Sequence, residues 1–419
     1  MKVAIVSINY RPEPTGISVY STGLAEHLAQ AGDSVDVYTG FPYYPRWRKA
    51  PGHEWLWYWT ENIGGVSVRR HYLYVPRRPS ALRRMVHELS FVFSVSLGYL
   101  LGPRPGVTVI VTPSLFTGIP IALLAKLKGS ATLLHVQDLQ PDAAVDLGML
   151  RRGPAARFFY WIERLTYRLC DRVSTISEGM RKRIASKGVP TTKLAVLYNW
   201  ANDDQVCAID GATELRREWG LEDKFVVLYS GNMGFKQGLD SLLDCADVLR
   251  AEKDIAFVIV GDGGEKESLM HAAEAMKLGN VQFRPLQPMD RLGELLATAN
   301  VSAIPQKCGV TDIVLPSKLA NILASGRPVV AAAANGTELA HIVRDGDCGR
   351  VVPQGNTVLM AEAILELRDD PELCARFGAN GRRYMEAHLA KGAILGSFRN
   401  ELQALAAGEL PASQAAPSR

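Results

Sequence analysis

The chain has 419 residues, more than a single hydrophobic core usually organises, so two domains are expected. Its 47% hydrophobic and 21% charged residues exclude an extended disordered protein. The net charge is only +4, but residues 1–200 contain 25 basic and 13 acidic side chains, while the remainder is acidic. A basic half predicts an anionic ligand or surface. Because no nucleic-acid-binding motif accompanies the charge, we expect no nucleic acid partner.

The compartment is indicated by the start of the chain and by its cysteines. The first residues, MKVAIVSINYRP, lead directly into a predicted strand and lack the pattern of a secretory signal. The six cysteines form no CxxC pair, which predicts reduced thiols rather than disulfides or a zinc site. Both observations favour a cytoplasmic protein. The doublets Asp203-Asp204 and Asp369-Asp370 are typical of solvated loop acids, so no metal site is expected.

Short runs of β-branched residues alternate with amphipathic helical stretches along most of the chain. Uninterrupted apolar strands of this kind are typical of parallel sheets covered by helices on both faces. The predicted fold class is α/β, with two Rossmann-like domains whose parallel sheets face each other across a cleft. The predicted strands are Val3–Ile8, Val35–Thr39, Val66–Tyr74, Val107–Thr112, Thr132–Val136, Val173–Ile176, Leu194–Leu197, Phe225–Tyr229, Ala256–Val260, Val281–Phe283, Val301–Ile304 and Val329–Ala332, and the clearest helices are Ser21–Gln30, Leu239–Arg250 and Glu265–Lys277.

The domain boundaries follow from where this pattern breaks. The alternation restarts at Phe225 after a polar, irregular stretch, which predicts a linker there. The small, polar and Pro-containing end of the chain is typical of disorder. We therefore expect an N-terminal domain at 1–200, a linker at 201–222, a C-terminal domain at 223–385, a helix at 386–406 that packs back towards the N-terminal domain, and a disordered tail at 407–419.

The turn after the first strand reads NYRPEPTGI and ends in Gly16, immediately before a predicted helix. A glycine lets the backbone approach a ligand closely, and a helix N-terminus offers free N–H groups to an anion. A plain turn glycine is the alternative. The GxGxxG pattern of a dinucleotide fold is missing, which disfavours an NAD(P)-dependent oxidoreductase.

Residues 76–101 combine a basic stretch with 13 mostly apolar residues, LSFVFSVSLGYLL. A helix that spans a bilayer needs about 20 apolar residues, so this segment is too short to span. With the preceding Trp55–Trp59 aromatics it resembles a monotopic contact with anionic inner-membrane lipid. An ordinary buried helix with an exposed basic flank is the alternative.

Polar residues follow the predicted strand Thr132–Val136, in the run HVQDLQPD. Because ligands of open α/β sheets bind at the carboxyl ends of the strands, His135 and Asp138 are candidates for positioning or deprotonating an acceptor hydroxyl. A satisfied core histidine and a loop aspartate are the alternatives.

The second domain has glycine-rich loops after its first two strands, GNMGFKQG from Gly231 and GDGG from Gly261. Both are strand-to-helix loops that can accept phosphate oxygens, and Lys236 supplies a cation. Further on, Leu315-Pro316-Ser317-Lys318 opens a predicted helix that ends at Gly326. Ser317, Lys318 and the free N–H groups of this helix predict a pyrophosphate site, and a capped surface helix is the alternative.

The order of these motifs resembles the retaining glycosyltransferases of family four, which have the GT-B fold. The resemblance covers residues 1 to about 406, including YNWAND, SGNMGFKQGLDSLL, VIVGDGGEKESL and PSKLANILASGRPVVA. Within the family, NYRPEPTGI, HVQDLQPDAAVDLGML and LPSKLANILASGRPVV are similar to the colanic-acid-type fucosyltransferase branch.

The resemblance implies a role for each candidate residue. The N-terminal domain would bind the acceptor and the C-terminal domain the nucleotide sugar, with Gly16, Ser317 and Lys318 at the diphosphate. The loop Gly261, Asp262 and Gly263 and the stretch with Gln287 would approach the nucleotide base. The sequence departs from the family at four positions, all of which carry amides. The family's ribose-binding glutamate aligns with Asn321, its phosphate-binding arginine and lysine with Asn232 and Gln237, and its catalytic-site histidine with Gln137.

The expected function is metal-independent transfer of a sugar, of the fucose type, from a GDP- or UDP-linked donor, with retention of stereochemistry. The basic first domain and residues 76–101 together suggest a polyprenyl-diphosphate-linked saccharide acceptor, and the resemblance implies exopolysaccharide or surface-glycan biosynthesis. No cofactor is expected. The catalytic candidates are His135, Asp138 and Lys318. A sugar-nucleotide 2-epimerase and a non-catalytic nucleotide-sugar-binding partner are the alternatives.

Overall fold

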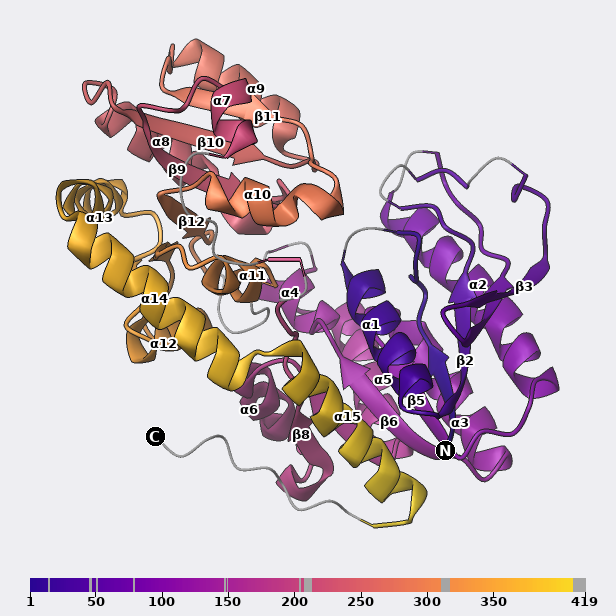
Figure 1. Cartoon of the computed structure of the whole chain (residues 1–419). Helices are drawn as coiled ribbons and strands as arrows, with labels where there is room; N and C mark the ends of the chain where they lie inside the picture. Colours follow the sequence, from indigo (N-terminus) through magenta and orange to yellow (C-terminus); the bar gives the residue numbers. More distant parts are fainter. Residues whose placement is uncertain are drawn as a thin grey trace. The chain divides into compact units, whose positions relative to one another are not determined.

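The computed structural model describes residues 1–13, 16–44, 47–49, 52–77, 80–146, 148, 150–202, 205–206, 213–309 and 317–409 (Figure 1). The chain forms two compact units. The first contains Met1–Tyr198 together with the chain from Ile394 on, and the second contains Asn199–Ala393. Of the predicted tail at 407–419, residues 410–419 lie outside the described residues.

The first unit is built on an eight-stranded sheet. Its strand order is β3-β4-β2-β1-β5-β6-β7-β8, and all described pairings are parallel except that of β3 with β4. The strands are, in that order, Tyr58–Ile63, Val66–His71, Ser34–Gly40, Lys2–Val6, Val107–Val111, Ala131–Val136, Arg172–Thr175 and Leu194–Val196.

The chain leaves β1 on one side to form β2 and later returns on the other side to form β5, since both strands pair with β1. The strand order therefore reverses at β1, and the carboxyl end of β1 is the topological switch point where open α/β sheets bind ligands. The predicted Gly16 loop leaves the sheet at this point.

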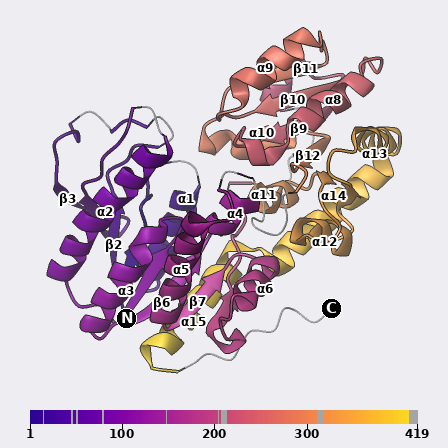
Figure 2. The same cartoon turned by 180° about the vertical axis from the view of Figure 1, so that it is seen from behind.

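Helices cover both faces of this sheet (Figures 1 and 2). The helix α2 contacts α3, and α3 contacts α5, so these three form one layer, while α1 and the C-terminal α15 lie on the opposite face. The helices of the first unit are α1 Ile17–Gln30, α2 Ala81–Leu101, α3 Gly118–Leu127, α4 Gln140–Asp146, α5 Pro154–Leu169, α6 Glu178–Ser186 and α15 Lys391–Ala406.

The last helix, α15, is held in the first unit by polar and aromatic contacts. Glu401 forms an ion pair with the fully buried Arg172 of β7, and Arg399 forms one with Asp33, at 2.9 Å between Nε and Oδ2. The Phe398 ring lies 4.9 Å from the His135 ring, centroid to centroid. These contacts join residues more than 200 positions apart in sequence, and they bury charged groups with their partners, as stability requires.

The second unit has a six-stranded, all-parallel sheet of order β11-β10-β9-β12-β13-β14. Its apolar core is formed by these strands with α8, α9, α13 and α14. Here the strand order reverses at β9, so the loop that follows β9 is at the switch point. In spatial order the strands are Val281–Arg284, Ile255–Val260, Phe225–Ser230, Val301–Pro305, Val329–Ala332 and Gly349–Val352, and the helices are α7 Glu214–Glu218, α8 Asp240–Val248, α9 Lys266–Ala275, α10 Leu292–Ala297, α11 Lys318–Ala324, α12 Glu338–Asp345, α13 Thr357–Asp369 and α14 Pro371–His388.

The described part of segment 201–222, predicted as a linker, packs within the second unit. The Leu215 N–H donates to Glu294 Oε1 at 2.8 Å, and the Thr213 and Thr298 hydroxyls lie 3.0 Å apart. The segment also includes the helix α7. Residues 203–204 and 207–212 of it lie outside the described residues.

Both sheets confirm the predicted α/β fold class of two parallel-sheet domains. The twelve predicted strands are present, and β3 and β14 are additional. None of the helices in the described part of the chain combines the length and the apolar character needed to span a membrane.

Candidate active site

The two glycine loops of the second unit interlock at the carboxyl edge of its sheet. The Gly231 N–H donates to the Val260 carbonyl at 2.9 Å, and the Met233 N–H donates to the Asp262 carbonyl at 2.8 Å. A Cβ atom at Gly261 would lie 1.9 Å from the Gly231 carbonyl oxygen, so no larger residue fits there without moving the backbone. The sequence thus needs glycine where the two loops touch, and the loops form a fixed edge beside β9 and β10.

The side chain of Lys318 reaches this edge from the first turn of α11. Its ammonium nitrogen lies 3.6 Å from the centroid of the Tyr229 ring, and a Cβ atom at Gly231 would lie 3.0 Å from it. The nitrogen is buried and has no hydrogen-bond partner among the described residues. Burial lowers the pKa of Lys318 to about 7. A buried ammonium that lacks a hydrogen-bonding partner is unfavourable by itself, so this position is suited to a bound anion.

The Lys318 ammonium group lies over the face of the Tyr229 ring. Tyr229 is buried at the end of β9, and its hydroxyl donates to the Asn232 carbonyl at 2.6 Å, which fixes the ring under the Lys318 nitrogen. Burial raises the pKa of the Tyr229 hydroxyl, so the ring stays neutral and contributes its π-face alone. The loop after β9 and the lysine of α11 therefore meet at one point, although Gly231 and Lys318 are 87 positions apart in the sequence.

Four further predicted residues of the second unit lie in the same two loops. A Cβ at Gly234 would lie 2.9 Å from Asn232 Nδ2 and 3.0 Å from Gln237 Oε1, so these two amides flank Gly234. The Lys236 carbonyl accepts a hydrogen bond from Lys307 N at 3.1 Å. Asp262 is exposed, and its Oδ1 accepts from the Gly263 N–H at 2.9 Å.

Three other predicted residues belong to other segments of the second unit. Ser317 is the residue before α11, and its side chain makes no capping hydrogen bond, whereas Pro316 lies outside the described residues. Gln287 follows β11 and donates from Nε2 to the Pro285 carbonyl at 2.9 Å. Asn321 accepts a hydrogen bond from the Asn202 N–H at 2.7 Å, between Oδ1 and N. This amide thus holds the start of the second unit against α11.

In the first unit, Gly16 precedes α1 with φ of 66°, a backbone conformation that only glycine adopts readily. The loop is fixed by Glu13, whose side chain is buried and accepts from the Tyr43 and Tyr44 N–H groups at 2.9 and 2.8 Å. Its other oxygen accepts from Asn9 Nδ2 at 2.8 Å, and burial raises the pKa of the carboxyl despite these bonds. The sequence did not identify Glu13 as a candidate, although Glu13 lies within the motif NYRPEPTGI that contains the candidate Gly16.

The candidate His135 is a buried histidine at the end of β6. Its Nε2 accepts from the Gln137 amide at 2.8 Å, and its Nδ1 therefore carries the proton and donates to Ser174 Oγ at 2.9 Å. Burial lowers the pKa of the ring to about 3, so the imidazole is neutral at pH 7. Both nitrogens are occupied, an arrangement that suits positioning of Gln137. Asp138 follows at the carboxyl edge and lines, with Glu163 and Tyr167, a cavity of about 20 Å³.

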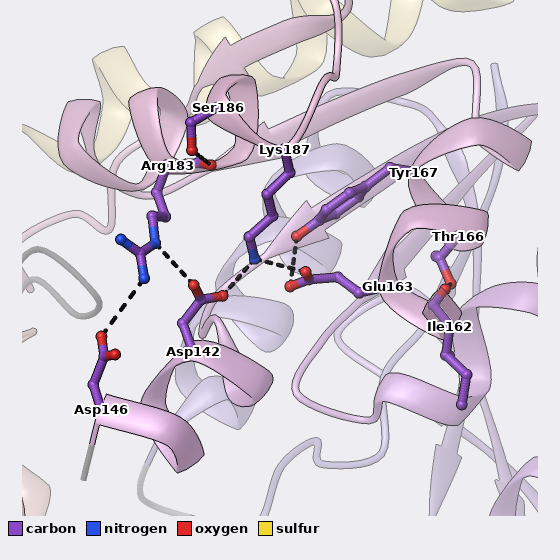
Figure 3. A network of polar contacts seen from close by, with 9 residues as sticks. All are labelled: Asp142, Asp146, Ile162, Glu163, Thr166, Tyr167, Arg183, Ser186 and Lys187. Atoms are coloured by element: carbon purple, nitrogen blue, oxygen red, sulfur yellow. Dashed lines mark hydrogen bonds and ion pairs between the residues drawn. The ribbon is translucent and has the colours of Figure 1, made fainter. Parts of the chain in front are cut away.

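A buried charge network lies next to this edge and was not predicted (Figure 3). Lys187, the residue that follows α6, pairs with Asp142 of α4 and with Glu163 of α5, the latter at 2.6 Å between Nζ and Oε2. Arg183 Nε donates to the other Asp142 oxygen at 2.8 Å, and the Tyr167 hydroxyl donates to Glu163 at 3.0 Å. The network ties α4, which begins two residues after Asp138, to α5 and α6. The sequence carries a signal for Asp142 alone, in the run DLQPD.

The structure therefore brings the predicted residues together in two groups. Gly261, Asp262, Gly263, Asn232, Gln237 and Lys318 lie around the switch point of the second unit, and Gln137 and Asp138 lie on the carboxyl edge of the first unit's sheet, as does the Gly16 loop. Within the described residues, no group of three or more His, Cys, Asp or Glu side chains is placed to hold a metal ion.

Comparison with known proteins identifies the family. The family described as Glycosyl transferase 4-like domain matches residues 15–200, and Glycosyl transferases group 1 matches residues 212–384. The chain is 37% identical over 413 residues to WcaI of Escherichia coli (strain K12), a protein that carries the provisional name of a colanic acid biosynthesis glycosyl transferase, and the match covers 96% of this chain and 100% of WcaI.

Solved structures agree on the fold. The sucrose-phosphate synthase of Thermosynechococcus elongatus superposes with a TM-score of 0.77 at 18% identity, covering 97% of this chain and 99% of that one. Anabaena HepE, solved in complex with UDP-glucose, gives a TM-score of 0.72 at 16% identity, covering 96% and 100%. With two parallel-sheet domains of this kind and near full-length similarity to WcaI, the chain belongs to the group 1, 4-like glycosyltransferases of the GT-B fold, and it is a glycosyltransferase.

Proposed function

We propose that the protein transfers a sugar of the fucose type from a nucleoside-diphosphate sugar to a lipid-linked saccharide, with retention of configuration, in the biosynthesis of a surface glycan. The similarity to WcaI supports the pathway class, since that relative is named for colanic acid biosynthesis. The HepE structures, which contain UDP and UDP-glucose, support a nucleotide-sugar donor. A lipid-linked acceptor would place the protein at the cytoplasmic face of the membrane as a peripheral protein.

The observation that carries the proposal is the buried ammonium group of Lys318 at the edge of the two glycine loops. A departing nucleoside diphosphate gains negative charge as its bond to the sugar breaks. A fixed cation beside backbone N–H groups stabilises that charge more than it stabilises the intact donor, and this difference lowers the barrier. Ser317 and the N–H groups of the first turn of α11 would bind the same diphosphate.

The reaction would proceed with the donor bond breaking ahead of the new bond. The bond between the anomeric carbon and the diphosphate oxygen lengthens, which leaves positive charge on the sugar ring. The acceptor hydroxyl oxygen bonds to the same carbon on the face that the diphosphate leaves. Its proton passes to the departing phosphate, so the products are the glycosylated acceptor and the nucleoside diphosphate. In this scheme the leaving group is the base, and His135, which stays neutral and buried, positions Gln137.

In this proposal, the position of each remaining candidate residue determines the part of the donor or acceptor that it would contact. The Gly16 N-terminus of α1 would contact the donor diphosphate from the first unit. Asn232, Lys236 and Gln237 would contact the phosphates or the transferred sugar, and Asp138 would bind an acceptor hydroxyl. Asp262, Gly261 and Gly263 with Gln287 would approach the base, and Asn321 would act through the Asn202 backbone that it holds.

The experiment compares the wild type with Lys318→Met and, as a control, Lys253→Met, which removes an exposed lysine elsewhere in the second unit. Thermal unfolding is followed with GDP, UDP, GDP-fucose and UDP-N-acetylfucosamine. A nucleotide at about 100 times its Kd adds about 2.7 kcal/mol of stability. We expect that increase for the wild type and Lys253→Met and its loss in Lys318→Met, together with at least a roughly hundredfold fall in transfer rate.

Three outcomes would contradict the proposal. Equal nucleotide stabilisation of Lys318→Met and wild type would remove the role of the lysine. Donor turnover to an isomeric nucleotide sugar without any acceptor would assign an epimerase. Tight donor binding without transfer or hydrolysis would assign a non-catalytic binding protein.

A further inference from the structure

The helix α2 is apolar on two faces. Its inner face, with Phe91, Val95 and Tyr99, is fully buried against the first unit's sheet. Its outer face carries a second apolar stripe at helical spacing, and each of these side chains is at least 43% exposed: Leu82, Val86, Leu89, Phe93, Leu97 and Leu100. A helix on the surface of a globular protein normally presents polar residues on its outer side. The second stripe therefore needs an explanation other than folding of this unit.

The helices α3 and α5 of the same layer (Figure 2) also carry exposed apolar side chains. On α3, Leu123 and Leu127 stand one turn apart and are exposed. On α5, the rings of Phe158 and Trp161 stack at 6.2 Å between centroids with both side chains more than half exposed. Since α2 contacts α3 and α3 contacts α5, these residues extend the stripe into one apolar surface, called here the α2–α3–α5 face. Soluble proteins rarely expose apolar patches of this extent unless the patch binds something.

The charges on the same three helices are one-sided. The exposed charged side chains are all basic: Arg83, Arg84, Lys126, Arg157, Arg164 and Arg168. The only acids on these helices are Glu88 and Glu163, and both are turned inward, where Glu88 accepts from Ser114 and Glu163 pairs with Lys187. An apolar surface with Trp and Phe that is bordered by arginine and lysine matches the chemistry of an anionic bilayer surface.

A second copy of the chain fits this surface less well. A symmetric dimer places a patch against itself, so the six basic side chains of each copy would be brought together without acids to balance them. A bilayer with anionic headgroups offers hydrocarbon to the apolar stripe and negative charge to its border at the same time. The charge pattern therefore favours lipid.

We propose that the α2–α3–α5 face is a lipid-binding surface through which the first unit lies on an anionic membrane. The stripe runs the length of α2, and α2 begins at the carboxyl edge of the sheet, where Glu88 meets Ser114 after β5. This is the edge that also carries the Gly16 loop and Asp138. A membrane bound along α2 thus lies next to the proposed acceptor edge of the same unit. The lipid affinity does not depend on the transfer reaction.

The test measures co-sedimentation of the full-length protein with vesicles of phosphatidylcholine, with and without phosphatidylglycerol, in the absence of nucleotide sugar. We expect binding to the anionic vesicles that salt weakens. Phe93→Glu with Leu127→Glu should lower the partition coefficient by roughly tenfold or more, because each change places a charge in the interface. The matched control, Val358→Glu with Leu359→Glu, adds the same charges to exposed apolar sites on α13 and should bind like the wild type. Each variant's thermal unfolding is measured first.

A second variant, Arg83→Gln with Arg84→Gln, keeps the apolar stripe and removes two cations. It should retain weak binding to neutral vesicles and lose the preference for anionic ones. Equal partitioning of the wild type and Phe93→Glu/Leu127→Glu would overturn the proposal, as would an equal loss in the α13 control. In another outcome, the wild type fails to bind vesicles and forms a dimer in sedimentation experiments. If Phe93→Glu/Leu127→Glu dissociated that dimer, the face would be assigned to self-association. Loss of lipid binding with normal nucleotide binding leaves the proposed transfer function standing.

Discussion

The ammonium nitrogen of Lys318 lies 3.6 Å from the centroid of the Tyr229 ring and has no hydrogen-bond partner among the described residues. Burial lowers the pKa of this lysine to about 7, whereas an unfolded lysine has a pKa of about 10.4. Between these two pH values the unfolded chain binds more protons than the folded chain. The free energy of unfolding should therefore rise with pH across this window, by an amount that Lys318→Met removes.

Binding of a nucleoside diphosphate should reverse this pKa shift, because an anion beside the lysine favours its charged form. At pH 8 the free protein holds Lys318 mostly neutral, so binding should take up most of one proton. Calorimetric titration with GDP or UDP in two buffers of different ionisation enthalpy measures that uptake. Lys318→Met should bind weakly with no uptake, and Lys253→Met should match the wild type. An uptake that is equal in Lys318→Met would show that another group titrates.

Gly261→Ala should disrupt the glycine loops, because its Cβ would lie 1.9 Å from the Gly231 carbonyl and its φ is +154°. We expect the free energy of unfolding of the second unit to fall by more than about 2 kcal/mol, with loss of nucleotide binding. Gly264→Ala is the matched control three residues further on, since no atom lies within 4 Å of its Cβ position. Denaturant unfolding of both variants decides the point. Two equally stable variants would mean that the loops are not in contact.

Asn321→Ala should loosen the start of the second unit. The change leaves the Asn202 N–H without its acceptor. The loss lowers the free energy of unfolding by about 1–3 kcal/mol when such a donor is buried, and by less here because the bond is only partly buried. Asn335→Ala removes an exposed amide that contacts Arg344 and should change the melting temperature little. Thermal unfolding with and without nucleotide separates two effects. If Asn321 touches the ribose directly, Asn321→Ala weakens nucleotide binding further than its stability loss explains.

Lys187→Met should be strongly destabilising. It leaves the buried Glu163 carboxylate without its cation and Asp142 with Arg183 alone, and breaking a buried ion pair costs about 3–5 kcal/mol. Lys182→Met, which removes an exposed lysine within α6, is the control. Calorimetry should show the loss in the transition of the first unit, while nucleotide binding by the second unit is retained. A melting curve like that of the control would show that the network contributes little.

The strands of both sheets were predictable because they are buried in the middle of parallel sheets. A strand such as β10, IAFVIV, has no face turned to water, so it consists of apolar and β-branched residues without alternation. The strand β3 was not predicted because it is an antiparallel edge strand with exposed aromatic side chains, and exposed Trp59 is equally typical of a membrane contact. The strand β14, GRVV, was not predicted because it is an edge strand that begins with a glycine and an arginine and so shows no apolar run.

Part of the site was predictable for a related reason. Glycines in strand-to-helix loops can be recognised from the sequence, and Gly261 and Gly16 both lie between a predicted strand and a predicted helix. The partners of Lys318, Asn321 and Lys187 were not predictable, because each is contributed by an element far away in the chain. Asn202 and Asn321 are ordinary polar residues in sequence, 119 positions apart, until folding places one N–H against one amide oxygen. The neutral state of His135 likewise depends on its burial beneath Phe398, which comes from the last helix.

The position of α15 in the first unit has a consequence for synthesis of the protein on the ribosome. Residues 199–393 are contiguous, so the second unit can fold as soon as they emerge, whereas the first unit waits for the last helix to be translated. Until then the guanidinium of Arg172 lacks Glu401, and His135 lacks the Phe398 ring. A premature stop codon near residue 390 would therefore spare most of the second unit and leave the first unit, although it is made earlier, incomplete.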